Sequence, residues 1–224
     1  MDPQYPCFFG SQAEKSGHLY YSFIEDPAAT SELHVTLRNF IEISSRHLNE
    51  RNNLVVFFKP DTGAVTHEEW RDRTWQILQQ LHNADQQPWS ETTPAQPSDH
   101  RWEFCYGGTL FFVVALAPSY VLRKSRNMGP GLILLFQPRD VFANPATGED
   151  VGQEARDLIR RRLREWDDVE VHPDLGTFGD PEKHEWKQYF LSDDVTPEPG
   201  RCPFSHRSQT KSLARAATPK QGAS

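Results

Sequence analysis

The stretch that decides the fold is residues 102–116, which read WEFCYGGTLFFVVAL. Two strongly apolar runs flank the glycine pair Gly107-Gly108. Apolar runs that meet at two glycines are typical of a β-hairpin with a two-residue loop. Because a hairpin joins antiparallel strands, a sheet that contains one is not purely parallel. We therefore expect a mixed sheet.

Helices and further strands alternate on either side of this hairpin. The apolar periodicities predict an α/β (α+β) fold, a mixed β-sheet with a hairpin, flanked by helices in a single domain over residues 1–205. A basic tail over residues 206–224 is predicted to be disordered because it lacks an apolar pattern. Further strands are predicted at 19–25, 54–59 and 132–138, and helices at 30–48, 66–81, 118–126, 152–166 and within 182–191.

Composition excludes several classes of protein. The chain has 224 residues and a formal net charge of -7, which argues against nucleic acid as a partner, since phosphate binding needs a basic face. Three cysteines lie far apart without a CxxC pair, so neither a structural zinc site nor a disulfide framework is expected. With no signal-peptide pattern and no long apolar window, we expect a cytoplasmic protein that does not span a membrane.

Nucleotide-binding and hydrolase motifs are also absent from the sequence. Instead, a few short stretches combine cysteine, aromatic and charged residues that a hydrophobic core alone would not require. These are YPCFFG (5–10), WEFCYGGTLFF (102–112), APSYVLRKSRN (117–127), FQPRDVF (136–142), HPDLGTFGDPEKHEWKQYFL (172–191) and CPF (202–204).

This set of motifs, in this order, resembles the YqcI/YcgG family from about Pro6 to Phe204. The resemblance implies a haem-dependent monooxygenase of specialised metabolism. Some members of the family N-hydroxylate guanidino or amino groups of amino-acid-like substrates. The expected partners are therefore a small-molecule substrate, haem and an electron donor.

Haem needs cationic partners for its two propionates and an axial ligand for its iron. Arg123, Arg126 and Arg139 are the candidates for the propionates, because guanidinium groups bind carboxylates in a bidentate manner. The spacing of Arg123 and Arg126 also allows an ordinary structural role, in which both pair with acidic residues of a neighbouring element.

Three residues are candidates for the axial ligand. Where the family pattern implies a histidine at or near position 120, this chain has Tyr120, which would then also take part in catalysis. Tyrosinate can hold ferric haem when an arginine lowers its pKa. Cys105 and His172 are the other two candidates. Each has a plainer alternative: Tyr120 as a core residue, Cys105 as a small buried hydrophobe and His172 as a surface loop residue.

A guanidinium or ammonium substrate would need a carboxylate to orient it. Glu185, within HEWKQY, is the first candidate, and Glu103 is the second. An exposed helix glutamate is the alternative for Glu185. The competing functions are a non-catalytic haem or small-molecule binding protein of the same fold, and a scaffold that uses an aromatic surface.

Overall fold

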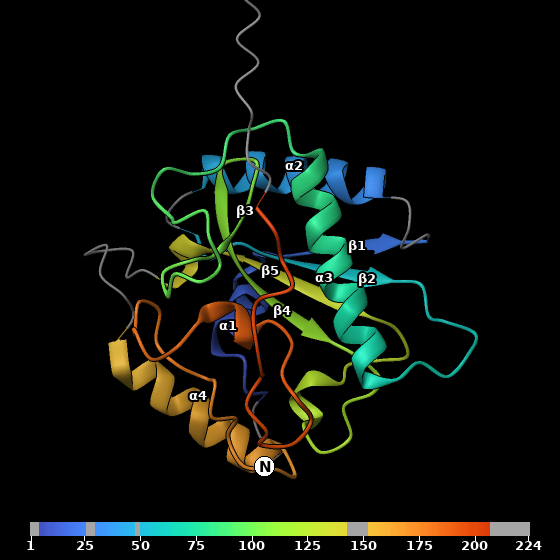
Figure 1. The fold of residues 1–224 in the computed structure, drawn as a ribbon. Helices are drawn as coiled ribbons and strands as arrows, with labels where there is room; N and C mark the ends of the chain where they lie inside the picture. Colours follow the sequence, from blue (N-terminus) through green and yellow to red (C-terminus); the bar gives the residue numbers. More distant parts are fainter. Residues whose placement is uncertain (1–4, 26–29, 48–49, 143–151, 207–224) are drawn as a thin grey trace, which may run out of the picture.

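The computed structural model describes residues 5–25, 30–47, 50–142 and 152–206. Helices and strands alternate along these segments (Figure 1). The helices are α1 (Phe8–Ser16), α2 (Thr30–Arg46), α3 (His67–Ala84) and α4 (Gly152–Trp166). The strands are β1 (Leu19–Ile24), β2 (Asn53–Phe58), β3 (Phe104–Tyr106), β4 (Thr109–Leu116) and β5 (Ile133–Pro138). Short 3₁₀ helices span Lys124–Arg126, Arg139–Phe142 and Glu185–Gln188.

The five strands form one sheet in the order β1-β2-β5-β4-β3. The β1 and β2 strands pair in parallel, with α2 as the crossover between them. The pairs β2–β5, β4–β5 and β3–β4 are antiparallel. The predicted mixed sheet with flanking helices is therefore confirmed.

The hairpin forms as the glycine pair predicts. Tyr106 pairs with Thr109, which leaves Gly107 and Gly108 as the loop, with φ values of 59° and 75°. Both residues therefore occupy the left-handed region, as a type I′ hairpin turn requires. The Gly107 amide also donates a hydrogen bond of 2.7 Å to Asp85 Oδ2, which ties the hairpin to the end of α3.

The two glycines make a matched pair for a test of the hairpin. A Cβ at position 107 would lie 2.8 Å from Cδ1 of Ile41, whereas a Cβ at position 108 would meet nothing within 4 Å. We expect Gly108→Ala to cost about 1–2 kcal/mol of unfolding free energy from backbone strain alone. Gly107→Ala should cost more because Ile41 must also shift. Urea unfolding of both variants measures this, and equal losses would show that the Ile41 contact is irrelevant.

One face of the sheet packs under α2 and α3 (Figure 1). Alternate residues of β2 and β4 point into this core, including Val56 and Val113, both fully buried. A capping box starts α3: Thr66 accepts a hydrogen bond from the Glu69 amide, and Glu69 accepts one from the Thr66 amide. This face carries most of the large buried side chains, so it is the structural core.

The predicted helix at 118–126 is wrong. Only its last three residues form a 3₁₀ turn. Asp193 supplies the physical reason: its carboxylate accepts hydrogen bonds of 2.8–3.1 Å from the amides of Val121, Leu122 and Arg123. Successive amides that converge on one anion form a nest, and this arrangement replaces the helical hydrogen bonds. The helix expected within 182–191 is likewise reduced to the 3₁₀ turn Glu185–Gln188.

The two ends of the chain add features that the sequence did not predict. The N-terminal helix α1 was not expected. At the other end, the ring of His206 lies 5.0 Å from that of Trp89, and residues 207–224 of the predicted tail lie outside the described residues. Within the described segments, no helix combines the length and apolar character needed to cross a bilayer.

Candidate functional site

The second face of the sheet borders a cavity of about 1370 Å³. Residues of β2, β4 and β5 form its floor, and residues of α1, α4 and the loop at 175–178 enclose it. Aromatic and aliphatic side chains dominate the wall, which includes Phe9, Phe57, Phe112, Val114, Leu116, Ile133, Leu135, Phe142, Ile159, Leu163, Trp166 and Phe178. The cavity lies on the opposite side of the sheet from the structural core.

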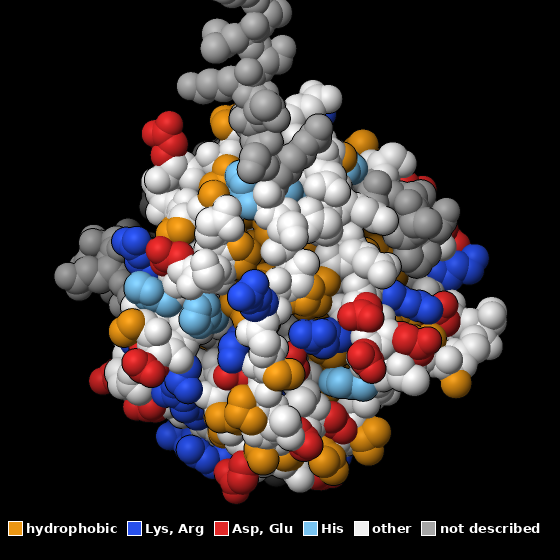
Figure 2. Space-filling view, viewed as in Figure 1, with side chains coloured by type: hydrophobic (Ala, Val, Ile, Leu, Met, Phe, Trp, Pro, Cys, Tyr) orange, Lys and Arg blue, Asp and Glu red, His pale blue; other side chains and the backbone are white. Residues whose placement is uncertain are grey.

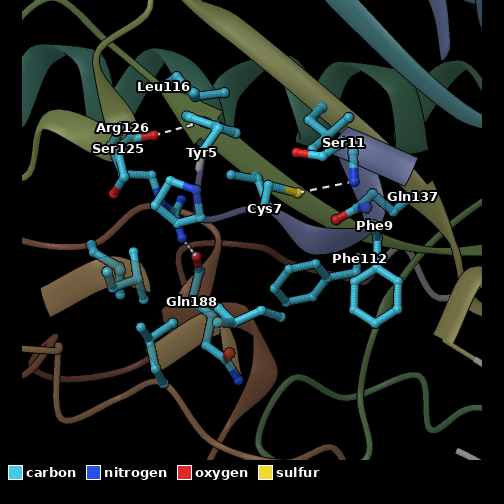
Figure 3. Close-up of a pocket in the computed structure, with 18 of the residues that line it drawn as sticks. Tyr5, Cys7, Phe9, Ser11, Phe112, Leu116, Ser125, Arg126, Gln137 and Gln188 are labelled. Carbon is cyan, nitrogen blue, oxygen red and sulfur yellow. Dashed lines mark hydrogen bonds between the residues drawn. The ribbon is translucent and has the colours of Figure 1, made fainter. Parts of the chain in front are cut away.

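One cysteine opens into this cavity. Cys7 is the N-cap of α1, and its Sγ accepts a hydrogen bond of 3.3 Å from the Gly10 amide. A Cβ at position 10 would lie 3.0 Å from that sulfur, so glycine is what permits the close approach. Burial raises the pKa of the Cys7 thiol, while the Gly10 amide and Arg126 act in the opposite direction. Figure 3 shows the sulfur inside the cavity, between Tyr5 and the ring of Phe112.

Arg126, which also lines the cavity, holds the backbone around it. Its guanidinium donates hydrogen bonds to the carbonyls of Ala115, Gln188 and Tyr189 at 3.0–3.3 Å. The bond to Gln188 is drawn in Figure 3. Arg126 therefore fixes β4 against the segment that carries Glu185.

Arg123 has a similar backbone role. It donates to the carbonyls of Ser192 and Asp194 at 3.2 and 2.7 Å, and its Nη1 lies 3.7 Å from Asp167 Oδ2. The alternative role for this pair of arginines, a structural ion pair, thus has a partner in Asp167. Backbone carbonyls thus engage Nε and Nη2 of Arg123 and both Nη atoms of Arg126, whereas Arg123 Nη1 is buried without a hydrogen bond from the described residues.

Arg139 sits between two buried glutamates. Its Nη1 lies 2.8 Å from Glu103 Oε1 and donates to Glu185 Oε2 at 3.2 Å. The Glu103 side chain is 0% exposed and that of Glu185 is 4% exposed. The guanidinium of Arg139 also stacks on Phe178, with its Cζ 3.5 Å from the ring centroid. The sequence named all three charged residues, and the structure brings them together at the cavity wall, with Glu185 and Arg139 facing the cavity and Glu103 behind them.

Burial dominates the electrostatics of this acid pair. It raises the pKa of both carboxyls, and the proximity of Glu103 raises that of Glu185 well above its usual value. Arg139 acts in the opposite direction but does not offset burial. Two buried carboxyls beside one guanidinium therefore keep a proton to a higher pH than exposed glutamates do.

This pair makes stability depend on pH. The folded state keeps a proton on Glu185 above the unfolded pKa, so the free energy of unfolding falls as pH rises between the unfolded and folded pKa values, by at most about 1.4 kcal/mol per pH unit for one proton. We expect Glu185→Gln to flatten this slope and to gain stability relative to wild type as pH rises. Thermal unfolding from pH 5 to 8 tests this. Glu14→Gln, an exposed position on the cavity rim, should leave the slope unchanged.

The three ligand candidates from the sequence lie apart from the cavity lining. Tyr120 is buried in the structural core, where its hydroxyl donates to the Leu191 carbonyl and accepts from the Leu191 amide. Burial raises its pKa, which Arg126 and Arg123 only partly offset. Cys105 is buried in β3, and burial raises its pKa to about 11.

His172 is also buried rather than exposed on a loop. Its Nδ1 accepts from the Asp174 amide at 3.1 Å. Its Nε2 therefore carries the proton and donates to Ser192 Oγ or the Thr196 carbonyl. Burial lowers the pKa of His172 to about 4, so the ring is neutral with both nitrogens engaged.

The sequence profile of the YqcI/YcgG family matches residues 1–205. The chain belongs to this family. Two uncharacterised family relatives from Bacillus subtilis, YcgG and YqcI, are 35% and 34% identical to it, each over 90% of this chain and 81% and 80% of their own lengths. A Streptomyces lavendulae protein, DcsA, is 30% identical over 92% of this chain and 80% of its own length. DcsA is provisionally named an N(omega)-hydroxy-L-arginine synthase. No solved structure matches this chain.

The YqcI/YcgG motifs converge on the cavity. The PCFFG stretch supplies the thiol and its glycine, FQPR supplies Gln137 and Arg139, and EWKQY supplies Glu185 and Gln188. Cys7 was not among the ligand candidates from the sequence because no N-terminal helix was expected. The combination of a cysteine with a glycine three residues later at the start of a helix was the available signal. Within the described residues, no three or more His, Cys, Asp or Glu side chains gather as a metal site.

Proposed function

We propose that this protein is a haem-dependent monooxygenase that N-hydroxylates a small substrate with a guanidino or amino group. The observation that carries the proposal is one large aromatic cavity into which both a thiol and a buried glutamate open. The name of the S. lavendulae relative supports the reaction class. The size and the lining of the cavity support haem as the cofactor.

The cavity is large and apolar enough for a macrocycle. Pockets for drug-sized ligands typically measure about 300–1000 Å³, and this one measures about 1370 Å³. It therefore has room for a porphyrin and a small substrate together. Phe9 and Phe112 offer flat apolar walls of the kind that a macrocycle packs against.

Among the cavity-lining residues, Cys7 is the best candidate for the iron ligand. Thiolate is an established haem ligand. The amide of Gly10 and the start of α1 favour negative charge on the sulfur. Burial raises the pKa of both Cys7 and Tyr5, which also lines the cavity, but the Tyr5 hydroxyl already donates to the Ser125 carbonyl at 2.8 Å. None of the described residues that line the cavity is a histidine.

Arginines from α4 are suited to the propionates. Arg156 and Arg160 lie one turn apart and both line the cavity. Arg160 makes long contacts, at 3.4 Å to the Leu175 carbonyl and 3.6 Å to Asp157. Figure 2 shows basic side chains gathered at the lower left of the viewed face, where α4 lies in Figure 1, beside acidic ones. Arg139, which the sequence suggested for a propionate, also lines the cavity but is already paired with Glu103 and Glu185.

The chain's own contribution to catalysis is to orient the substrate and exclude water. Bound haem would supply the iron at which dioxygen is activated. Glu185 would hold the substrate cation at the cavity wall, so that one nitrogen faces the haem. The apolar walls would keep bulk water away from the reacting nitrogen.

The test is an absorption spectrum of protein produced with added haem precursor, before and after dithionite and carbon monoxide. We expect a Soret band whose ferrous–CO position indicates thiolate ligation. Incubation with L-arginine, dioxygen and an electron donor should then give a hydroxylated product by mass spectrometry. A well-folded protein without a Soret band after haem reconstitution would refute the proposal. Haem binding without turnover of any guanidino or amino substrate would favour the non-catalytic haem-binding alternative.

A further inference from the structure

The acid pair beside the cavity has unmet hydrogen-bonding capacity. Three of its four carboxyl oxygens, both of Glu103 and Oε1 of Glu185, accept no hydrogen bond from any described residue. Arg139 Nη1 is close to Glu103 Oε1 but is aligned to donate to Glu185 Oε2. Buried acceptors without donors are costly, by about 1–3 kcal/mol each and more when charged. The pair therefore requires either a shared proton or an external donor.

The charges of this site are also unbalanced. Two carboxylates face one guanidinium, and among the described residues Arg139 is the one cation that acts on either glutamate. Two other described titratable groups, Tyr189 and Cys105, interact with the pair, and burial raises the pKa of both, so both stay neutral. Tyr189 also has both hydrogen-bonding partners of its hydroxyl within the protein. Its hydroxyl accepts from the Phe104 amide and donates to the Phe111 carbonyl. Full ionisation would leave one buried negative charge unpaired, which is unfavourable.

The cavity gives a second cation access to this charge. Glu185 and Arg139 both line it, together with Gln137 and Gln188. Arg139 is held on the ring of Phe178, so its guanidinium covers one side of the pair. A cation that enters beside Glu185 would complete a balance of two negative and two positive groups. A planar guanidinium would suit the empty acceptors best, because it presents several N–H donors in one fixed plane.

We propose that Glu103 and Glu185 share one proton in the empty cavity and release it when a substrate cation takes its place. This inference rests on the proposed function and narrows it. The substrate is bound as a monocation, with guanidinium preferred, and one proton leaves for each molecule bound. Glu103 does not face the cavity and acts as a positioning residue. Its carboxyl adds the second negative charge, so that the site lacks one positive charge until a cation binds.

The first test is calorimetric titration of the purified protein with L-arginine, agmatine and guanidinium chloride. Parallel runs in phosphate and Tris buffers, which differ in ionisation enthalpy, report the protons exchanged. We expect release of about one proton per ligand at neutral pH and at least about tenfold weaker binding of L-citrulline, the neutral isostere of arginine. Glu185→Gln should weaken cation binding at least about tenfold and abolish proton release. Glu103→Gln should abolish proton release, while Glu14→Gln should behave as wild type.

Binding without proton release would overturn the proposal, as would equal affinity for L-citrulline or the absence of binding by all three cations. The shared proton is tested independently by infrared spectroscopy at neutral pH. A carboxylic-acid carbonyl band should be present in wild type and Glu14→Gln and lost in both Glu103→Gln and Glu185→Gln. Its absence from wild type would also overturn the proposal. Neither readout depends on haem, so a missing Soret band beside intact proton release would refute only the proposed cofactor.

Discussion

Replacement of Cys7 by serine is expected to remove the thiolate signature from the haem spectrum and to weaken haem binding by at least about tenfold. Serine is a better N-cap than cysteine and can accept the same hydrogen bond from the Gly10 amide, so α1 should remain folded. The substitution therefore exchanges the ligand atom while it keeps the cap. The ferrous–CO spectrum and a haem titration followed at the Soret band are the two measurements.

Matched controls come from the other two cysteines. Cys105 is buried in β3, and Cys202 packs against the structural core. Cys105→Ala and Cys202→Ala should keep the wild-type spectrum. If Cys7→Ser keeps the thiolate signature and Cys105→Ala loses it, the cavity described here is not the haem site. Tyr120→Phe and His172→Ala extend the comparison to the other ligands that the sequence suggested.

Much of the fold was predictable because it follows from local patterns. The glycine pair specifies the hairpin, the Thr66 capping box starts α3, and the continuous apolar run in β2 marks a strand with two covered faces. The failures have a common cause in distant partners. Asp193 accepts hydrogen bonds from the amides at 121–123, and the sequence of residues 118–126 gives no sign of this distant partner. α1 escaped prediction because its cap is a cysteine, which is not among the preferred N-cap residues.

The candidate site was predictable in its chemistry but not in its assembly. Arg139, Glu103 and Glu185 were identified as the charged residues of interest, and the structure brings them together. The ligand candidates were chosen by residue type and local context. The sequence of β4 cannot say which of its two apolar faces meets helices and which meets a cavity. α1 and α4 enclose the cavity on one face of β4. Cys7 lies on this side and Tyr120 on the other, which makes Cys7 the better ligand candidate.

Substitution of Arg126 by methionine is expected to lower the free energy of unfolding by roughly 2–4 kcal/mol, because it removes three hydrogen bonds to buried carbonyls. Arg126 bonds the carbonyls of Ala115, Gln188 and Tyr189, and methionine fills similar space but cannot donate. Arg126→Lys should recover part of the loss. Lys124→Met removes an exposed ion pair with Asp168 and should cost less than about 1 kcal/mol. Urea unfolding monitored by tryptophan fluorescence gives all three values.

The same variant separates the two roles that the sequence allowed for Arg126. If the Arg126 guanidinium only bonds backbone carbonyls, Arg126→Met should lower the free energy of unfolding. Its haem affinity should then fall only indirectly, through greater mobility of the segment around Gln188. If the guanidinium binds a propionate instead, Arg126→Met should lose haem affinity while its stability without haem stays near that of wild type. The three carbonyl bonds favour the first outcome. Because Gln188 lies three residues from Glu185, a loosened segment should also weaken binding of guanidinium ligands, and Lys124→Met should not.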